Sequence, residues 1–449
     1  MKKAVITILG TIGGYCKDDR GIYNEQIQEA LYKSEIEDIK ETKDKNSLPI
    51  LIKTYSKEYD IIPIHTTCAK DIQQQVLKNS NDETVTKFEI KDEYKIKDDQ
   101  NYDETFRQID DIISSYDKVI VDVSHGYRHL PILMIVNVIM QNIENINKIE
   151  KIIFAKELEK NKIYQFIDLK RYLDLANITY ALTTFDRNYT VANNMKVNDH
   201  ALNDFLNDLS KFSKHILANS LDELLTNSNK KKSVTTKLIN QINNILENEN
   251  ENFVSLNRLL KKSLEHLKDI EKLKDKIDYE KLYYLSENMY KKGYLLNSIT
   301  LLSEAVGMYC TARLKDISPE IADFINEYEE KANLEKNNPR NYFKIYTLYN
   351  QSKVFYTSKV YRGIFLNVEV TSKKSEVKQK LKKWNQGAEK ITELIKKELQ
   401  EDNELKILIR NIDQIRNNLA HANSSKRLTD VEDEIKKVLD DFQQMISNI

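Results

Sequence analysis

Over the first 195 of its 449 residues, the chain alternates short, continuous apolar runs with segments of helical spacing. Five runs rich in β-branched residues predict strands: residues 4–9, 61–65, 118–123, 149–155 and 163–167. Three other segments have helical spacing: residues 25–32, 106–114 and 131–143. Strands that are apolar along their whole length are typical of a parallel sheet with helices on both faces, so we expect an α/β domain here.

From residue 196 onward such runs are missing, and apolar residues recur at i, i+3 and i+4, which is typical of amphipathic helices. The segments with this spacing are residues 202–225, 234–273, 279–290, 295–314, 375–398, 404–422 and 428–446. The charge changes at the same place. Residues 1–195 hold 27 basic and 32 acidic residues (net −5), and residues 196–449 hold 42 and 38 (net +4). We therefore expect an all-α region after the α/β domain.

The charges of the whole chain nearly cancel, with 69 basic and 70 acidic residues. This balance argues against a broadly basic nucleic-acid coat but allows a local basic groove. Cys16, Cys68 and Cys310 lie far apart, so we expect no disulfide framework, no structural zinc site and a reducing cytoplasm. The longest apolar runs are too short to span a membrane, and the N-terminal run ends at Gly10 without a cleavage site, so we expect neither a membrane span nor a signal peptide.

A glycine-rich loop follows the first predicted strand, with glycines at 10, 13 and 14 around Thr11. Loops at the carboxyl ends of strands form the ligand crevice of a doubly wound sheet, and glycines let the backbone approach a phosphate or ribose. We therefore take Gly10, Thr11 and Gly13 as candidate ligand contacts; the alternative is a plain turn from strand to helix. The dinucleotide fingerprint G-x-G-x-x-G is missing, which argues against a nicotinamide dehydrogenase.

A second cluster of polar residues follows the strongest predicted strand. Ser124, His125, Gly126 and Arg128 stand between that strand and an apolar helix, for which Pro131 is a suitable first residue. Backbone N–H groups together with an arginine suit an anionic, phosphate-bearing ligand. A lone histidine here would be structural, but the density of donors at a strand end favours ligand binding. The esterase motif G-x-S-x-G is not present.

The third motif is Arg416-Asn417-Asn418-Leu419-Ala420-His421, near the end of a predicted helix. Histidine can transfer protons near neutral pH and arginine can stabilise charge on a phosphate, so the pair suits RNA cleavage by the substrate's own 2′-hydroxyl, without a metal. Five helical residues span about 500°, which leaves the two side chains about 140° apart. A symmetric dimer would bring two such helices together. The alternative is an arginine paired with a carboxylate, followed by a capping histidine.

These motifs together resemble the CARF–HEPN ribonucleases, ancillary effectors of type III CRISPR antiviral defence. The matching residues are Leu9-Gly10-Thr11 and Asp122-x-Ser124-His125-Gly126 in the first domain, and Arg416, Asn417 and His421 in the last. The resemblance implies a Rossmann-like CARF sensor over residues 1–195, a helical connector over 196–290 and a helical HEPN ribonuclease domain over 291–449.

The resemblance also implies how such a protein works. A homodimer binds a cyclic oligoadenylate, with the tetra-adenylate favoured, and this activator switches on a metal-independent endoribonuclease that cuts single-stranded RNA. Arg416 and His421 carry over as catalytic residues and Asn417 as their polar support. Thr11, His125, Gly126 and Arg128 carry over as ligand contacts, and no cofactor is implied.

Two other functions stay open. One is a non-enzymatic sensor whose helical domain binds a partner or DNA, although the net charge of +4 is spread too thinly for a compact recognition helix. The other, compatible with the ribonuclease, is a sensor domain that degrades its own activator. The sequence also leaves open the ring size and the RNA base preference.

Overall fold

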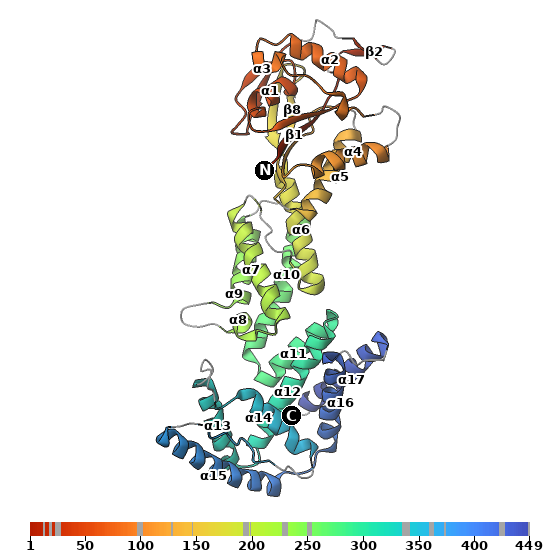
Figure 1. Cartoon of the computed structure of the whole chain (residues 1–449). Helices are drawn as coiled ribbons and strands as arrows, with labels where there is room; N and C mark the ends of the chain where they lie inside the picture. The colour runs from red at the N-terminus through yellow and green to blue at the C-terminus, as the bar shows by residue number, and fades with distance from the viewer. Residues whose placement is uncertain are drawn as a thin grey trace. The chain divides into compact units, whose positions relative to one another are not determined.

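The structure is a computed structural model in which the chain divides into two compact units. The first unit contains Met1–Ala181 and Ala192–Asn207, and the second contains Leu182–Val191 and Asp208–Ile449 (Figure 1). The structure describes residues 1–11, 14–17, 20–22, 28–96, 102–126, 129–145, 147–191, 197, 199–226, 232–248, 254–334, 342–358, 363–371, 374–421 and 427–447.

The first unit is built on a seven-stranded sheet with the strand order β5-β4-β9-β8-β7-β1-β6. Its strands are β1 (Lys3–Ile8), β4 (Ala30–Ser34), β5 (Thr42–Asp44), β6 (Asp60–Ile64), β7 (Lys118–Asp122), β8 (Ile149–Glu159) and β9 (Ile163–Asp168). The five predicted strands are therefore present. Neighbours are parallel from β8 through β7 and β1 to β6, whereas β9 runs antiparallel to β8.

The prediction of a purely parallel sheet is wrong, because β8 and β9 form a hairpin. Only residues 160–162 separate the two strands, and a connection this short can join only antiparallel neighbours. Asn161 takes a left-handed conformation, with φ 56°, within this turn. Beyond β9, β4 is parallel to β9 and β5 is antiparallel to β4, so the sheet is mixed.

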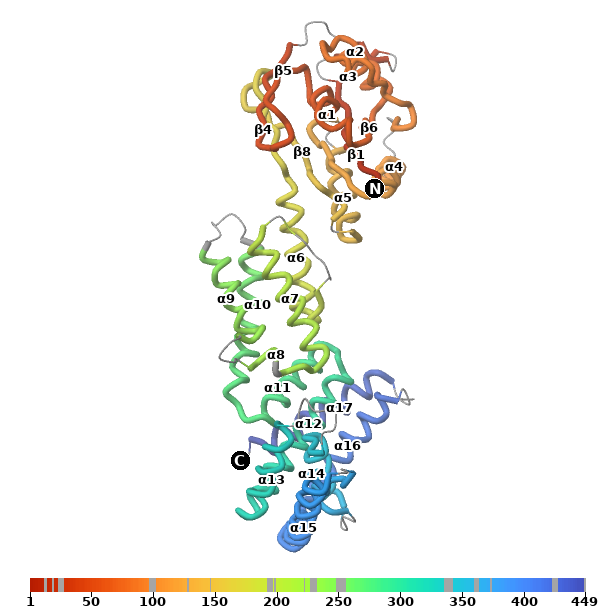
Figure 2. The backbone as a smooth tube through the Cα atoms, turned by 60° about the vertical axis from the view of Figure 1, so that its left-hand side comes forward, coloured from red at the N-terminus to blue at the C-terminus, as the bar shows by residue number. Residues whose placement is uncertain are grey.

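Helices cover both faces of the sheet, as predicted. The unit contains α1 (Ser47–Tyr55), α2 (Thr67–Lys78), α3 (Glu83–Thr86), the 3-10 turn η1 (Asp92–Tyr94), α4 (Tyr102–Ser114) and α5 (His129–Glu144). Successive side chains of β1 point to opposite faces: Val5 packs in a core with Leu51 of α1, and Ile6 in a core with Met134 of α5. Figure 2 shows the strands between these helices.

The helix predicted over residues 25–32 is wrong where the structure describes it. Residues 30–34 form β4, and Ala30 and Tyr32 are buried on one side while Leu31 between them is partly exposed. That alternation follows the two-residue period of a strand, and it is too short to distinguish from a helix in the sequence. Residues 25–27 lie outside the described residues.

A small hairpin, β2 (Tyr15–Lys17) and β3 (Arg20–Ile22), packs against α2. A disulfide joins Cys16 of this hairpin to Cys68 of α2, with 5.7 Å between their Cα atoms. The expectation of unpaired cysteines is therefore wrong for this pair, because only the folding of the hairpin over α2 brings together two residues 52 positions apart. Gly21 permits the contact, since a Cβ on Gly21 would overlap the carbonyl oxygen of Cys68. Cys310 is free and buried.

The described residues of the second unit form helices and no strand, as the amphipathic pattern predicted. After α6 (Lys170–Asn188) and α7 (His200–Leu217), through which the unit boundary passes, the helices are α8 (Leu221–Leu225), α9 (Val234–Asn248), α10 (Val254–Lys272), η2 (Leu273–Asp275), α11 (Asp278–Lys291), α12 (Leu295–Lys315), α13 (Pro319–Leu334), α14 (Ile345–Thr357), α15 (Ser375–Glu398), α16 (Asn403–Ala420) and α17 (Leu428–Ser447). Helices α13 and α14 were not predicted. The buried helix α12 packs against α11, α14 and α16.

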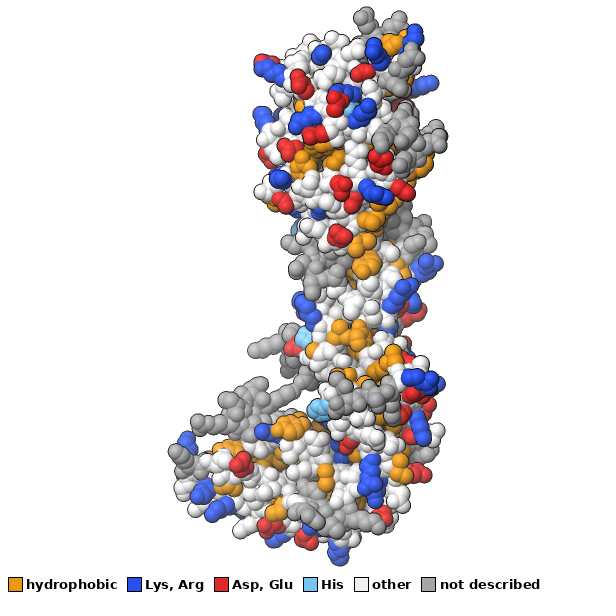
Figure 3. Space-filling view, turned by 45° about the vertical axis from the view of Figure 1, so that its right-hand side comes forward, with side chains coloured by type: hydrophobic (Ala, Val, Ile, Leu, Met, Phe, Trp, Pro, Cys, Tyr) orange, Lys and Arg blue, Asp and Glu red, His pale blue; other side chains and the backbone are white. Residues whose placement is uncertain are grey.

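Two surface properties complete the description. None of the helices in the described part of the chain is both long and apolar enough to cross a membrane. Acidic and basic side chains are interspersed on the visible face of the first unit, without a large area of one sign (Figure 3). This mixed surface agrees with the similar numbers of basic and acidic residues over residues 1–195, 27 and 32.

Candidate functional site

The loops after β1 and β7 meet at one edge of the sheet, because these strands are parallel neighbours. A Cβ on Gly10 would lie 3.2 Å from the backbone nitrogen of Gly126 and 3.4 Å from His125 Cβ. Gly126 has φ +104°, and a Cβ there would overlap Ile8, so only glycine fits. The structure thus brings together four predicted ligand residues, Gly10, Ser124, His125 and Gly126, and Thr11 follows Gly10 directly. Gly13 and Arg128 lie outside the described residues.

Asp122, the last residue of β7, holds these loops in place through hydrogen bonds. Its fully buried carboxylate accepts hydrogen bonds from the hydroxyls of Thr7 (2.7 Å), Ser47 (3.2 Å) and Ser124, and from the Ser124 backbone nitrogen (3.0 Å). The Ser124 hydroxyl also accepts a hydrogen bond from the backbone nitrogen of Ala155 (2.8 Å). The Ser124 side chain therefore links the end of β7 to β8. Its hydroxyl, which was expected to contact a ligand, is already engaged in hydrogen bonds within the protein.

One ring nitrogen of His125, in the loop after β7, has no hydrogen-bond partner among the described residues. Its Nε2 is shielded from solvent and forms no hydrogen bond within the described residues. Burial lowers the pKa of His125, and the nearby Asp122 carboxylate opposes this shift only in part. The ring is thus neutral at neutral pH, and a buried polar atom without a partner is costly unless a ligand or water completes it.

Residues of α1 and α2 that were not predicted hold the Gly10 loop in place. Gln73 Nε2 donates to the carbonyl oxygen of Gly10 (2.8 Å), and Asn46 Nδ2 donates to Gln73 Oε1 (2.7 Å). Asn46 also caps α1 by accepting from the backbone nitrogen of Leu48. An asparagine just before an apolar run is a helix-start signal that could have located α1. With the Cys16–Cys68 disulfide a few residues further on, the loop is anchored on both sides.

The third motif lies at the carboxyl end of α16. Arg416 is partly buried, whereas Asn417 and His421 are exposed. The backbone nitrogen of His421 donates to the carbonyl oxygen of Asn417 (3.1 Å), so His421 occupies the capping position. Arg416 forms no ion pair with any residue that the structure describes. Of the alternative given for this motif, the capping histidine is therefore present at His421. The expected pairing of Arg416 with a carboxylate is absent among the described residues.

The acidic residue nearest before Arg416 in the sequence of α16 is Asp413, and it pairs with a buried lysine of α14. Lys353 of α14 is buried, and its Nζ lies 2.9 Å from the Ser303 hydroxyl and 3.3 Å from Asp413 Oδ1. Asp413 stands one turn before Arg416 on α16. Asp413 therefore pairs with Lys353, and among the described residues it forms no ion pair with Arg416. Lys353 could not be found from the sequence, because no sequence pattern shows that α14 packs on α16.

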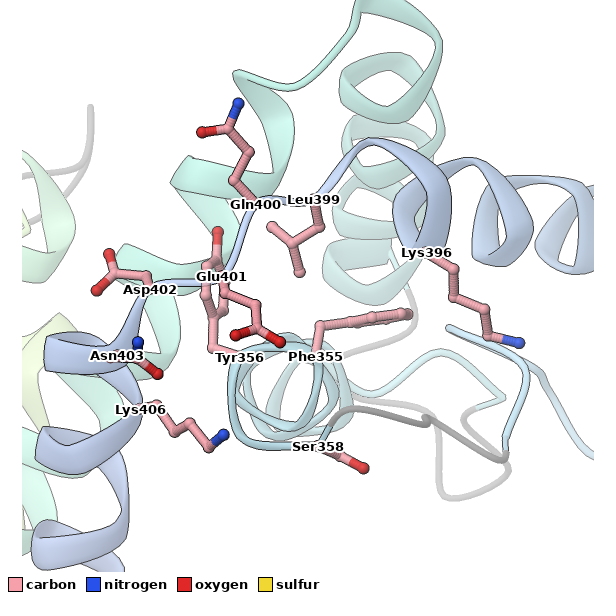
Figure 4. Close-up of a pocket in the computed structure, with 10 residues that line it drawn as sticks. All are labelled: Phe355, Tyr356, Ser358, Lys396, Leu399, Gln400, Glu401, Asp402, Asn403 and Lys406. Carbon is pink, nitrogen blue, oxygen red and sulfur yellow. The ribbon is translucent and has the colours of Figure 1, made fainter.

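A pocket of about 310 Å³ lies at the opposite end of α16 (Figure 4). It is lined by Phe355, Tyr356, Ser358, Lys396, Leu399, Gln400, Glu401, Asp402, Asn403 and Lys406. Asp402 caps α16, accepting a hydrogen bond from the backbone nitrogen of Leu405 (2.9 Å). Burial raises the pKa of the Tyr356 hydroxyl. The 18 residues of α16 span about 27 Å at 1.5 Å per residue, so this pocket is separate from Arg416 and His421.

No family model matches the chain, and a search of the curated proteins finds no similar sequence. Among the described residues, no group of three or more histidine, cysteine, aspartate or glutamate side chains is arranged to hold a metal ion. The two candidate sites are therefore the polar loops after β1 and β7 in the first unit and an arginine–histidine pair in the second, each within its own unit.

Proposed function

We propose that the chain is an endoribonuclease that a cyclic oligoadenylate activates and that needs no metal ion. In this proposal the first unit is a Rossmann-like CARF sensor, and the second carries a HEPN-type ribonuclease site at the end of α16. The observation that carries the proposal is the environment of Arg416: its guanidinium is partly buried, it pairs with no acidic residue that the structure describes, and an exposed histidine follows five residues later. A structural arginine in that position would be expected to pair with a carboxylate.

The chemistry follows from the two side chains. The RNA 2′-hydroxyl loses its proton to a base and attacks the neighbouring phosphorus, while the leaving 5′-oxygen takes up a proton. His421 acts as the acid–base group, Arg416 stabilises the negative charge that develops on the phosphate, and Asn417 supports them by hydrogen bonding. The products are a 2′,3′-cyclic phosphate and a 5′-hydroxyl.

A homodimer supplies the geometry that one helix lacks. An ideal helix would place the side chains of Arg416 and His421 about 140° apart, so a single copy would converge them poorly on one phosphate. Two copies of α16 related by a two-fold axis would place two arginines and two histidines around a shared site.

The loops after β1 and β7 in the first unit suit the activator. Gly10 and Gly126 let these two loops approach each other closely, and His125 Nε2 is a polar atom without a partner among the described residues. A two-fold symmetric dimer would present these loops twice, which fits a ring of repeated nucleotides, and we favour the tetra-adenylate. Thr11, Gly13 and Arg128 complete the proposed ligand contacts.

An RNA cleavage assay with EDTA present tests this function. The purified protein is incubated with a labelled single strand and cyclic oligoadenylates of four, five or six units. We expect cleavage with the tetra-adenylate and none without activator. Activator binding without any RNA cleavage would instead favour a non-enzymatic sensor, and cleavage that EDTA abolishes would contradict the proposed chemistry.

A further inference from the structure

A second pocket, of about 710 Å³, opens between α13 and α15. Both helices belong to the second unit and pack against each other (Figures 1 and 2). None of its lining residues belongs to the loops after β1 and β7, to the Arg416–His421 motif or to the pocket at the start of α16. Its volume lies within the range of ligand-binding pockets, which is about 300–1,000 Å³.

Aromatic rings form one wall of this pocket. Trp384 stacks on Phe324 with 4.3 Å between the ring centroids and 24° between the planes, and Phe343 meets Trp384 edge-on at 5.1 Å. The indole Nε1 donates to the carbonyl oxygen of Leu366 (2.9 Å), which fixes the orientation of the ring. A wall of rigid, preoriented rings is suited to a flat aromatic ligand.

A glycine keeps space open beside these rings. Gly387 follows Trp384 by one helical turn, and a Cβ on Gly387 would lie 3.3 Å from Phe324 Cε2. A larger side chain there would occupy the space over Phe324. Trp384 and Phe343 are largely buried, with 8% and 6% of their surface exposed, and both still line the pocket.

The rim of the pocket is positively charged. Three lysines and one glutamate line it, a net charge of +2 in a chain of net charge −1. Lys331 pairs with Glu327 (3.1 Å), and its Nζ lies 5.8 Å from the Trp384 ring centroid. Lys380 and Lys383 are exposed on α15, and neither forms an ion pair within the described residues. Their charges are therefore available to an anion.

We propose that this pocket binds a nucleotide of single-stranded RNA, its base against the Trp384–Phe324 wall and its flanking phosphates on Lys380 and Lys383. Base stacking on aromatic rings beside cations that follow the backbone is the usual basis of single-strand binding. A free nucleotide has the same chemistry, but two lysines one turn apart on an exposed helix face suit consecutive phosphates. The assignment rests on the proposed ribonuclease function, to which it adds a substrate contact away from the scissile bond.

Trp384 is the single tryptophan of the chain, so the tryptophan fluorescence of the protein reports on this pocket. The full-length protein is titrated with a short single-stranded 2′-O-methyl RNA, which lacks the nucleophilic hydroxyl and cannot be cut by the proposed route. Tryptophan emission reports the pocket, and the anisotropy of a labelled strand reports total binding. We expect both signals to change over the same range of RNA concentration.

Two matched double variants separate the pocket from general charge effects. We expect Lys380→Gln/Lys383→Gln to raise the Kd for the strand at least fivefold. Each phosphate contact to a single strand contributes about 0.7 to the dependence of log K on log salt, so this slope should fall by about 1.4. The control, Lys378→Gln/Lys382→Gln, changes two exposed lysines of α15 that do not line the pocket and should stay within twofold of the wild type.

Three results would overturn the proposal: RNA binding with constant tryptophan emission, equal weakening by both double variants, or adenosine or uridine monophosphate binding the pocket as tightly as the strand does. The last result would identify a free nucleotide as the ligand. If tryptophan emission changes as expected but the protein cuts no RNA, the proposed ribonuclease function is refuted and the proposed RNA contact in the pocket is retained. If the protein cleaves RNA but its tryptophan emission does not change when RNA is added, only the proposed RNA contact in the pocket is refuted.

Discussion

Individual residues of this chain take their roles from their surroundings, and His266 shows this for stability. Its Nε2 lies 2.6 Å from the Tyr189 hydroxyl, among Lys292, Asp186 and other charged groups of the second unit. Burial, assisted by Lys292, lowers the pKa of His266 to about 4. Since a histidine in the unfolded chain has a pKa near 6.5, only the unfolded state gains this proton between about pH 6.5 and 4.

We therefore predict that His266 makes the protein lose stability as the pH falls from about 6.5 toward 4. One pKa unit corresponds to about 1.4 kcal/mol, so the loss should be on the order of 1–3 kcal/mol. Urea unfolding of the wild type and His266→Phe at pH 7.5, 6 and 5 measures it. The variant should depend less on pH over this interval, whereas exposed His421→Ala should keep the wild-type profile. Equal slopes in all three proteins would contradict the prediction.

Arg416 gives a prediction about function with little change in stability. Because no described acidic residue pairs with it, Arg416→Ala should lower RNA cleavage by about 100-fold or more while leaving the free energy of unfolding within about 1 kcal/mol of the wild type. Arg410→Ala is the matched control, since Arg410 lies on the same helix and donates to the carbonyl oxygen of Thr357 (3.2 Å). Normal cleavage by Arg416→Ala would assign the arginine a structural role.

Among the elements, the β2–β3 hairpin holds the loop of the proposed sensor site to α2. The Cys16–Cys68 disulfide closes a stretch with a sequence separation of 52 residues. By loop entropy, removing it should cost up to about 4 kcal/mol. We predict that Cys16→Ser lowers the melting temperature and weakens activator binding, because the Gly10 loop loses one of its two anchors. The change in dithiothreitol should match that of the variant.

The remaining cysteine supplies the control for this experiment. Cys310→Ala removes a buried thiol without touching the disulfide, so it should retain the response of the wild type to dithiothreitol. Thiol labelling followed by mass spectrometry counts the free cysteines. A wild type in which Cys16 and Cys68 are both labelled under native, oxidising conditions would contradict the disulfide.

The elements that the sequence predicted correctly are those whose patterns are long or strong. The run at residues 118–123 is apolar on both sides and forms β7, and the periodic segment of residues 375–398 forms α15 with the same bounds. β4 was wrong because its five residues are too few to separate a two-residue period from a helical one, and α13 was missed although it has 16 residues. The direction of β9 depends on a three-residue turn and not on any apolar pattern.

The candidate sites divide in a similar way. The meeting of the Gly10 and Gly126 loops follows from parallel strands, which the sequence did indicate. The partners of those loops do not: Gln73, Asn46 and Ser47 come from helices whose packing the sequence does not specify. The same holds for Lys353, whose contact with Asp413 joins residues 60 positions apart. Polar contacts between distant segments leave no local pattern to detect.

For the whole molecule, the proposed site requires two copies of the chain. We predict that mixing wild-type protein with an excess of His421→Ala, under conditions that allow exchange of copies, lowers cleavage more than simple dilution of the wild type does. The physical reason is that mixed dimers would hold one histidine at a site built from two. Light scattering checks the dimer. A monomeric protein whose activity falls in proportion to the wild-type fraction would contradict the shared site.

Sensing and cutting should also be separable by mutation, because the two clusters lie in different units. We predict that Arg128→Ala raises the activator concentration needed for half-maximal cleavage but spares the rate at saturation, since it removes a charge-assisted ligand contact. Dose–response curves of RNA cleavage with cyclic tetra-adenylate measure both quantities. A lower maximal rate with an unchanged midpoint would be the contrary result.

We propose that the arginine–histidine pair at the end of α16 cuts RNA. The most direct measurement compares wild type and His421→Ala in EDTA with saturating cyclic tetra-adenylate, using calorimetry for activator affinity and identification of the RNA ends. We expect wild-type products with 2′,3′-cyclic phosphate ends, and a His421→Ala protein that binds the activator normally but does not cleave. Normal turnover by His421→Ala would show that the chemistry lies elsewhere.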